Sequence, residues 1–392
     1  MSQHRVPDDV TAPATAPPPH PGASTSTGQV HLGDQVLMPA HRSDSRGLLT
    51  RLPTRVRVGL AALFFVVLAL IPTFSSQQYY LDVLIKVGLW AMLACGLNIV
   101  VAQAGLLDLG YIAFWGVGAY TTALFSSTAH DLHLPTWVCL PASAAAAAVF
   151  AIIIGFPTLR LRGDYLAIVT LGFGEIVRIA LNNLVTLTGG PSGIQAIDPP
   201  TLPGFEAGSQ LAPYYYLVLA GVVLVVAVSV WLRRGRLGMA WVALRDDELA
   251  ARASGLYPLR YYLLAFGLGA TFAGLSGGMF AYVQAAVSPD SFTVDQSFQV
   301  LAIVVLAGLS GRVWPVLLAT ALIIVLPEAL RGFDEYRLVL FGPILVAVVA
   351  FRHNAAAIKR LGRNLMERSS RGAVRPADSA SLQHGEAEGS LR

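Results

Sequence analysis

Long apolar runs separated by short polar stretches dominate the chain between residues 51 and 352. Most of these runs reach the length of about 20 residues that an α-helix needs to cross the hydrocarbon core of a bilayer. The pattern therefore predicts an all-α, polytopic integral membrane protein. The expected spans are 56–74, 79–101, 106–125, 134–156, 165–187, 214–232, 261–286, 298–309, 313–330 and 336–351. The run 106–125 carries Asp108 among Gly105, Gly110, Gly116 and Gly118, so it is either a broken helix or one packed very closely.

These runs give about ten transmembrane helices with both termini in the cytoplasm, or about eight if residues 298–330 form re-entrant elements instead. Residues 1–50 are rich in Pro, Ala, Ser, Thr and His and show no hydrophobic periodicity, which predicts a disordered cytoplasmic tail. The lack of an early apolar core argues against a cleaved signal peptide. Residues 353–392 are predicted to form a second disordered tail, which is basic.

Composition supports the membrane class. The chain is 55% hydrophobic and only 13% charged, whereas soluble domains carry about 25% charged residues. The formal net charge of +4 comes mainly from arginines that cluster in loops and tails. We interpret them as signals of membrane orientation rather than as a surface for nucleic acid.

The stretch 233–260 is the most highly charged loop between two spans. Short basic loops stay in the cytoplasm, which assigns this loop to the inner side. Its six arginines are Arg233, Arg234, Arg236, Arg245, Arg252 and Arg260, and its three acids are Asp246, Asp247 and Glu248. By contrast, the loops 188–213 and 288–296 contain acids and no Lys or Arg, which assigns them to the outside.

The charged loop is expected to contain one helix from Met239 to Leu256, because this stretch is rich in helix formers. Val242, Leu249 and Leu256 would form a narrow apolar stripe. Arg245, Glu248 and Arg252 would share another face at spacings that permit ion pairs. Such a helix either rests on lipid headgroups or the protein's own spans, or docks a cytoplasmic partner.

Small residues at Ala270, Gly274 and Gly278 recur along one face of the span 261–286 and should allow a neighbouring helix to approach closely. No Walker-type phosphate loop and no HExxH, CxxC or GxSxG pattern occurs. The sequence therefore predicts no catalytic residues, no metal site and no ATP site in this chain. Charges within the spans are few, which favours a permease powered from elsewhere over an ion-coupled carrier.

Three blocks of sequence carry a family resemblance. They are GLNIVVAQAGLLDLGYIAFWGVGAYTTALF (96–125), LRLRGDYLAIVTLGFGEIVR (159–178) with TGGPSGI (188–194), and GRLGMAWVALRDDELAARASG (235–255). Together, and in this order, they resemble the LivM-type permease of branched-chain amino acid ABC importers. The resemblance covers roughly residues 79–351. It implies a multi-pass protein of the bacterial inner (plasma) membrane.

The resemblance also implies partners. These are two ABC ATPase subunits that bind ATP and Mg²⁺, a second related permease subunit and an extracytoplasmic solute-binding protein, while this chain binds no cofactor itself. The charged loop would be the ATPase-coupling region. Ala250, Ala251 and Gly255 keep the family's Ala-Ala-x3-Gly spacing, but the acidic residue, Glu248, stands one place early. Arg245, Asp246 and Asp247 complete the predicted coupling set.

Polar residues inside the matching spans are candidates for the solute path. They are Asn98, Asp108, Tyr111, Thr170 and Glu175. A carboxylate could bind the ammonium of an amino acid, and a helix terminus or an amide its carboxylate. Each residue could instead serve packing, capping or, for Glu175, an ion pair with Arg178. The sequence does not separate branched-chain amino acids from urea or short amides, which related permeases carry. An ion-coupled carrier that uses Asp108 or Glu175 is the alternative of another class.

Overall fold

The computed structural model describes Gly59, Pro72 and residues 63–70, 78–127, 132–161, 163–201 and 211–329. All of these except Gly59 belong to the unit Ala61–Arg392. The tails predicted at 1–50 and 353–392 and the span predicted at 336–351 lie outside the described residues. The span predicted at 56–74 is described only in part, as a helical segment over residues 63–70.

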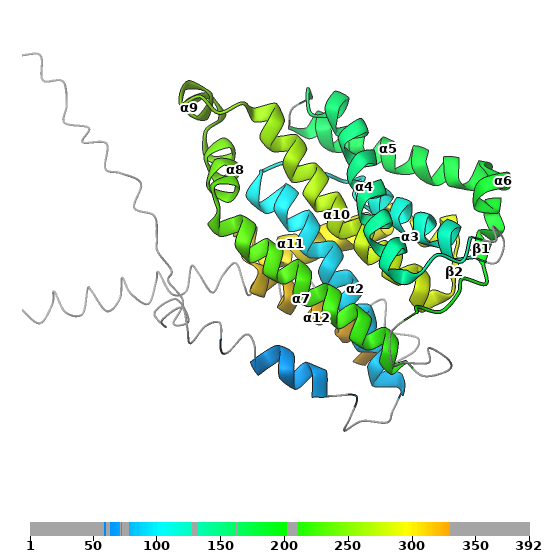
Figure 1. The fold of residues 1–392 in the computed structure, drawn as a ribbon. Helices are drawn as coiled ribbons and strands as arrows, with labels where there is room; N and C mark the ends of the chain where they lie inside the picture. The colour runs from blue at the N-terminus through cyan, green and yellow to red at the C-terminus, as the bar shows by residue number, and fades with distance from the viewer. Residues whose placement is uncertain are drawn as a thin grey trace, which may run out of the picture. The chain divides into compact units, whose positions relative to one another are not determined.

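Helices make up nearly all of the described part of the chain (Figure 1). The α-helices are α2 (Gln78–Asn98), α3 (Ile112–Ser126), α4 (Thr136–Thr158), α5 (Asp164–Asn183), α6 (Val185–Thr188), α7 (Ala212–Arg234), α8 (Arg236–Asp246), α9 (Glu248–Ala253), α10 (Pro258–Gln284), α11 (Val294–Ala307) and α12 (Val313–Ala329). The π-helix η2 (Ile99–Gln103) extends α2, and η4 (Gly190–Ser192) and η5 (Pro289–Ser291) are 3-10 turns. The strands β1 (Ile194–Gln195) and β2 (Ala286–Val287) pair antiparallel.

Five helices of the described residues are long and apolar enough to cross a membrane. A sixth span results if α5 and the α6–η4 pair are counted together, although they are bent by 79°. The helices α3 and α12 are apolar but shorter. The all-α, multi-pass prediction is thus confirmed, whereas the total of ten or eight spans stays a prediction.

Helix α10 lies at the centre of the bundle and packs against α2, α3 and α4. The predicted small-residue stripe lies in this interface, with Ala270 fully buried. A Cβ added at Gly274 would lie 2.5 Å from the Cβ of Ala147 in α4, and one added at Gly118 in α3 would lie 2.4 Å from the Cα of Gly274. Glycine at these positions lets three helix backbones meet.

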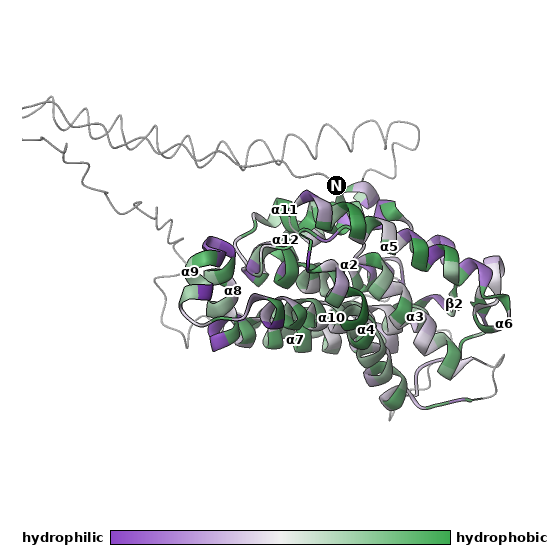
Figure 2. Cartoon of the chain, turned by 90° about the horizontal axis from the view of Figure 1, so that it is seen from above, coloured by the Kyte–Doolittle hydropathy of each residue, from purple (hydrophilic) through white to green (hydrophobic). Residues whose placement is uncertain are grey.

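The polar elements lie at opposite ends of the bundle. Helices α8 and α9 occupy one end, and α6, β1 and β2 occupy the other (Figure 1). Hydrophilic residues are prominent on α8 and α9, whereas α4 and α7 are mostly apolar (Figure 2). The basic loop 233–260 and the described arginine-free segments 188–201 and 288–296 are therefore separated by the length of the spans, as opposite sides of a membrane require.

Candidate functional site

The charged loop contains two helices, so the single helix predicted from Met239 to Leu256 is wrong. Helix α8 ends at Asp246 and α9 begins at Glu248. Between them Asp247 is extended, with φ −156°, and its carboxylate accepts hydrogen bonds from the backbone N–H groups of Leu249 at 2.9 Å and Ala250 at 3.0 Å. Aspartate caps a helix better than it continues one, and this local bond breaks the helix.

The break also changes which face is buried. The predicted stripe is wrong, because Val242 is 38% and Leu249 is 77% exposed. Helix α8 instead buries Trp241 and Leu244, and the Trp241 Nε1–H donates to the carbonyl oxygen of Tyr261 in α10 at 2.8 Å. The loop is thus anchored to the spans by α8, while the apolar side chain of Leu249 in α9 remains open to a partner.

Helix α9 ends in a Schellman motif at Gly255. The N–H of Leu256 bonds to the carbonyl of Ala251 at 3.1 Å, and the N–H of Gly255 bonds to that of Arg252 at 2.9 Å. Gly255 has φ +86°, which strongly favours glycine. This geometry explains the glycine of the Ala-Ala-x3-Gly spacing. Ala251 is buried, whereas Ala250 is exposed, and Glu248 pairs with Arg252 at 2.5 Å.

Arg245 does not join that pair. Its guanidinium donates to the carbonyl oxygen of Ala102 at the end of η2, to that of Leu309 in the turn between α11 and α12 at 3.5 Å, and to Asp246 at 3.3 Å. The backbone turns at Gly105, whose φ is +77°, and a Cβ there would lie 2.5 Å from the Arg245 Cγ. Arg245 therefore joins the charged loop to two other chain segments.

The stretch 105–110 is not helical, although it belongs to an apolar run. Its backbone N–H groups use side chains and local acceptors, as buried backbone must. The Leu109 N–H donates to Thr170 Oγ1 of α5 at 3.1 Å, and the Gly110 N–H donates to Asp108 Oδ1 at 2.9 Å. Helix α3 begins only at Ile112, so the run 106–125 is discontinuous, as the broken-helix alternative predicted.

Three predicted solute-path residues meet at this discontinuity. Asp108, Tyr111 and Thr170 are 1–3% exposed. The Tyr111 hydroxyl donates to the carbonyl oxygen of Gly269 in α10 at 2.6 Å, and Thr170 lies beside the Asp108 carboxylate. A Cβ at Gly110 would lie 2.0 Å from the Thr170 carbonyl oxygen. Asp108 keeps one oxygen, Oδ2, buried without a hydrogen-bond partner.

Two amides near this segment also have unpartnered polar atoms. Asn98 is 2% exposed and its Nδ2 has no hydrogen-bond partner, and both amide atoms of Gln103 are in the same state. Native proteins rarely leave such buried groups unsatisfied, so these atoms are candidates for contacts with water or with a polar solute. Gln103 was not among the predicted residues. The feature of the sequence that could have identified Gln103 is its polar amide within the apolar run that follows Asn98.

Glu175 differs from the other candidates. Its carboxylate pairs with Arg178 at 2.5 Å, and its side chain is 38% exposed. Arg178 also lies 3.9 Å from Asp290 of η5, so it links α5 to the loop 288–296. The structure does not bring the Glu175 carboxylate into the cluster of Asp108, Tyr111 and Thr170.

At the end opposite α8 and α9, the arginine-free loops are joined by backbone pairing. Strand β1 pairs with β2, and Ser127 after α3 forms a bridge with Ile197. A Cβ at Gly193 would lie 1.9 Å from the Val287 carbonyl oxygen, which makes glycine necessary there. His133 and Asp198 form a further link at 2.5 Å. These contacts build a cross-linked surface at this end of α3, α4 and α10.

No group of three or more His, Cys, Asp or Glu side chains suited to a metal occurs within the described ranges. Both cysteines, Cys95 and Cys139, are buried free thiols.

Comparison with known proteins fits this arrangement. The family model for the branched-chain amino acid transport system permease component matches residues 79–349. The high-affinity branched-chain amino acid transport system permease proteins LivM of Escherichia coli K12 and of Salmonella typhimurium LT2 are each 43% identical over 319 residues, which is 76% of this chain and 74% of each relative. A probable LivM permease of Methanocaldococcus jannaschii is 25% identical over 53% of this chain and 63% of its own length.

No solved structure matches the chain. The family match nevertheless spans both regions described above, from the discontinuous segment to the helices α8 and α9. A permease component of an ABC transporter is a multi-pass membrane subunit and not itself an enzyme, in agreement with the bundle and its two polar ends. The chain therefore belongs to the permease components of branched-chain amino acid transport systems.

Proposed function

We propose that this subunit imports branched-chain amino acids as half of a permease pair, driven by two ABC ATPases that bind ATP and Mg²⁺. The observation that carries the proposal is the two-helix loop α8–α9, which is anchored at Trp241 and exposes Leu249 at its tip. An exposed apolar side chain on a charged, capped helix suits a protein partner on the cytoplasmic side.

Coupling to the spans would use Arg245. A motion of α8 would act on the carbonyls of Ala102 and Leu309, to which Arg245 donates. Ala102 belongs to η2, and π-helical turns are frequent at functional sites. The segment that follows η2, residues 105–110, contains Asp108. An ATPase could in this way bias the buried polar cluster through one continuous set of contacts.

The solute path would pass the unpartnered polar atoms. The Asp108 Oδ2 would receive the ammonium group of the amino acid, and the amides of Asn98 and Gln103 would receive its carboxylate. The N–H groups of Leu109, Gly110 and Ile112 at the start of α3 already have protein acceptors. Side-chain amides are therefore better placed than this helix terminus to bind the carboxylate.

The remaining partners would use other surfaces. An extracytoplasmic binding protein would dock on the outer surface that β1, β2 and the bridge at Ser127 hold together. The second permease subunit would pack in the membrane. Helix α5 is one candidate contact, because Ile168 and Ile176 are 65% and 59% exposed.

The test measures uptake of leucine into proteoliposomes that contain the permease pair and the ATPases. The binding protein is present on the side from which leucine is taken up. Replacing Glu248 and Gly255 together should uncouple uptake from ATP hydrolysis while the complex remains in the membrane. The same substitutions should leave the binding of solute to the binding protein unchanged. Wild-type uptake by this double variant would contradict the assignment of α8–α9 as the coupling region.

An ion-coupled carrier is the second candidate, and the buried Asp108 carboxylate is the observation that favours it, because carriers use intramembrane carboxylates for protons or cations. The two functions differ in their energy source. Uptake that survives loss of the ATPases and collapses with an uncoupler would support the carrier. Uptake that requires ATP and survives the uncoupler supports the importer.

A further inference from the structure

Three separate segments meet where η2 ends, on the side of the bundle that carries α8 and α9. They are η2 itself, helix α8 with Arg245, and the turn 308–312 between α11 and α12. The Arg245 guanidinium donates to the carbonyl oxygen of Ala102 in η2 and to that of Leu309 in the turn. A single side chain from the charged loop thus bonds to both of the other segments.

The turn 308–312 covers the side chain of Gln103. A Cβ added at Gly311 would lie 2.9 Å from Gln103 Cγ and 3.9 Å from the carbonyl oxygen of Ala102. Gln103 is 2% exposed, and neither of its amide atoms has a hydrogen-bond partner. A permanent cover would leave this amide unsatisfied at a cost in free energy, whereas a cover that opens would let water or a solute reach it.

The backbone of the turn is held in an unfavourable conformation. Gly308 and Gly311 have φ values of +87° and +63°, which glycine adopts readily. Leu309 between them has φ +39°, which is disfavoured for a residue with a branched side chain. Its side chain is 46% exposed, so burial of the leucine does not offset the strain. The contacts of the turn with η2 and Arg245 therefore maintain this conformation.

We infer that the turn 308–312 is a gate that closes one end of the solute path over Gln103, and that Arg245 holds the gate closed. The inference rests on the proposed function, in which α8 moves with the ATPases. A motion of α8 that withdraws Arg245 from the Leu309 carbonyl would release a strained turn, with Gly308 and Gly311 as hinges. The open turn would expose the Gln103 amide to the departing solute.

A reversible cross-link tests whether the turn must move. Because Gly311 lies against Gln103 Cγ, cysteines at these two positions meet the Cβ separation of roughly 3.5–4.5 Å that a disulfide requires. The variant Gln103→Cys/Gly311→Cys is made in the full-length chain, with the buried thiols Cys95 and Cys139 replaced by alanine. The complete complex is reconstituted in proteoliposomes, and leucine uptake is measured after oxidation and again after reduction.

Oxidation should abolish uptake, and reduction should restore it. Unchanged uptake after complete oxidation, verified by counting the remaining free thiols, would overturn the gate. Failure of the disulfide to form would contradict the contact between Gly311 and Gln103. The proposed function is judged separately, because ATP-driven uptake by the reduced protein tests the importer and only the oxidised protein tests the gate.

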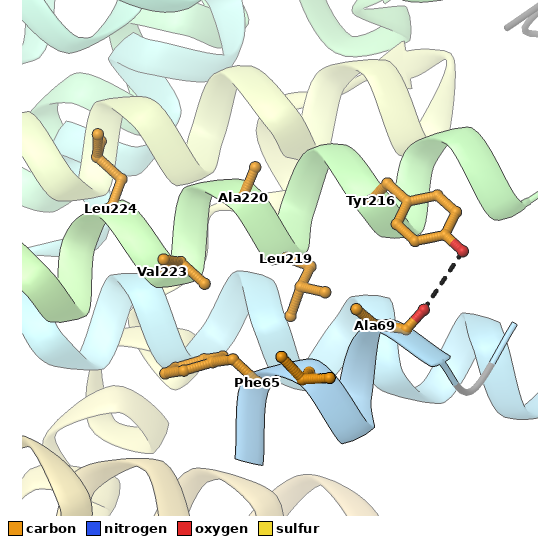
Figure 3. A pocket seen from close by; sticks show the side chains of 8 residues that line it. Phe65, Ala69, Tyr216, Leu219, Ala220, Val223 and Leu224 are labelled. Atoms are coloured by element: carbon orange, nitrogen blue, oxygen red, sulfur yellow. Dashed lines mark hydrogen bonds between the residues drawn. The ribbon is translucent and has the colours of Figure 1, made fainter. Parts of the chain in front are cut away.

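The matched control joins two helices that are not part of the gate. A Cβ at Gly88 in α2 would lie 3.9 Å from the Cβ of Val218 in α7, which also suits a disulfide. The other face of α7 is apolar and forms a groove that Ala220 and Val223 help to line (Figure 3). Oxidised Gly88→Cys/Val218→Cys should keep its uptake. Arrest of both oxidised pairs would show that any cross-link stops the bundle, and would overturn a specific role of the turn.

The reactivity of a single cysteine at position 103 tests the latch without a transport assay. In the complete complex in detergent, Gln103→Cys should react slowly with a charged thiol reagent. Adding Arg245→Gln should speed the reaction about tenfold, because a charged hydrogen bond that holds the gate is lost. Adding Leu309→Asn should slow it about fivefold, because asparagine tolerates the left-handed conformation of the closed turn. Arg236→Gln in the same helix is the control and should change nothing.

These opposite shifts separate a latch from general loosening of the fold. Faster labelling in both the Arg245→Gln and the Leu309→Asn variants would indicate a loss of packing and would overturn the inference. Equal labelling rates in all four proteins would remove Arg245 and the turn from control of access to position 103.

Discussion

The guanidinium of Arg245 in α8 donates a hydrogen bond to the carbonyl oxygen of Ala102, which lies 143 residues earlier in the chain. This bond joins the loop proposed to meet the ATPases to the end of the π-helix η2. The same side chain occupies the space that a Cβ at Gly105 would need. Arg245 thus connects the charged loop to the discontinuous segment that contains Asp108.

Replacing Arg245 by glutamine should lower ATP-driven uptake by about tenfold or more, because hydrogen bonds from a charged group contribute roughly 1.5–3 kcal/mol. ATP hydrolysis by the assembled complex should continue, so the ratio of solute transported to ATP hydrolysed should fall. Arg236→Gln in the same helix is the control and should transport normally. Parallel loss of hydrolysis and uptake would instead assign Arg245 to assembly of the complex.

Gly255→Ala should strain the end of α9 by about 1–2 kcal/mol, the cost of the left-handed conformation for a residue with a Cβ. A Cβ there meets no other atom within 4 Å, so the effect is conformational only. Coupling in the proteoliposome assay should weaken, and Gly255→Asn should be milder. Gly163→Ala, with φ +58° and equally open space outside the charged loop, is the control. If Gly163→Ala reduced coupling as much as Gly255→Ala does, the end of α9 would have no specific role in coupling.

Gly110→Ala should destabilise the bundle, since its Cβ would lie 2.0 Å from the Thr170 carbonyl oxygen. Overpacking of this kind costs about 1–3 kcal/mol or more. Thermal unfolding of the detergent-solubilised protein, followed by tryptophan fluorescence, should shift to lower temperature. Gly172→Ala in α5 has open space and no unusual φ, and it should be neutral or slightly stabilising. An unchanged unfolding temperature for Gly110→Ala would disprove the close approach.

Asp108→Asn keeps the size of the side chain but removes the negative charge. If Asp108 binds the ammonium of the solute, the concentration for half-maximal uptake should rise about tenfold or more, because a charge-assisted bond is lost. Asp82→Asn removes a carboxylate from the exposed pair with Lys86 and should have no effect on uptake. Unchanged uptake kinetics for Asp108→Asn would remove this residue from the solute path.

The hydropathy pattern predicted the long spans well. Helices α4, α7 and α10 begin and end within three residues of the spans expected at 134–156, 214–232 and 261–286. Their length and apolar composition leave little choice in a membrane, where the backbone must satisfy its own hydrogen bonds. The ion pair between Asp82 and Lys86 at 2.7 Å likewise depends only on the spacing of four residues along one helix.

Local competition between conformations was harder to predict. The stretch 236–253 is rich in helix formers, and the hydrogen bonds of the Asp247 carboxylate divide it into α8 and α9. The glycines and Asp108 of the run 106–125 left a broken helix open as one alternative, but the conformation of 105–110 depends on Thr170 of α5 and on close approach at Gly110. Contacts between segments that are far apart in the chain produce no periodic pattern of hydrophobic residues, so the hydropathy pattern does not reveal them.

The discontinuous segment also constrains biogenesis. The N–H of Leu109 is satisfied by Thr170, 61 residues later, and that of Ile112 by Ser297, 185 residues later. Until those acceptors have been synthesised and inserted, these donors must remain bonded to water or to the translocation machinery. The N-terminal third of the bundle therefore cannot mature as it emerges from the ribosome, and truncated chains that stop before Ser297 should be preferred substrates of membrane quality-control proteases.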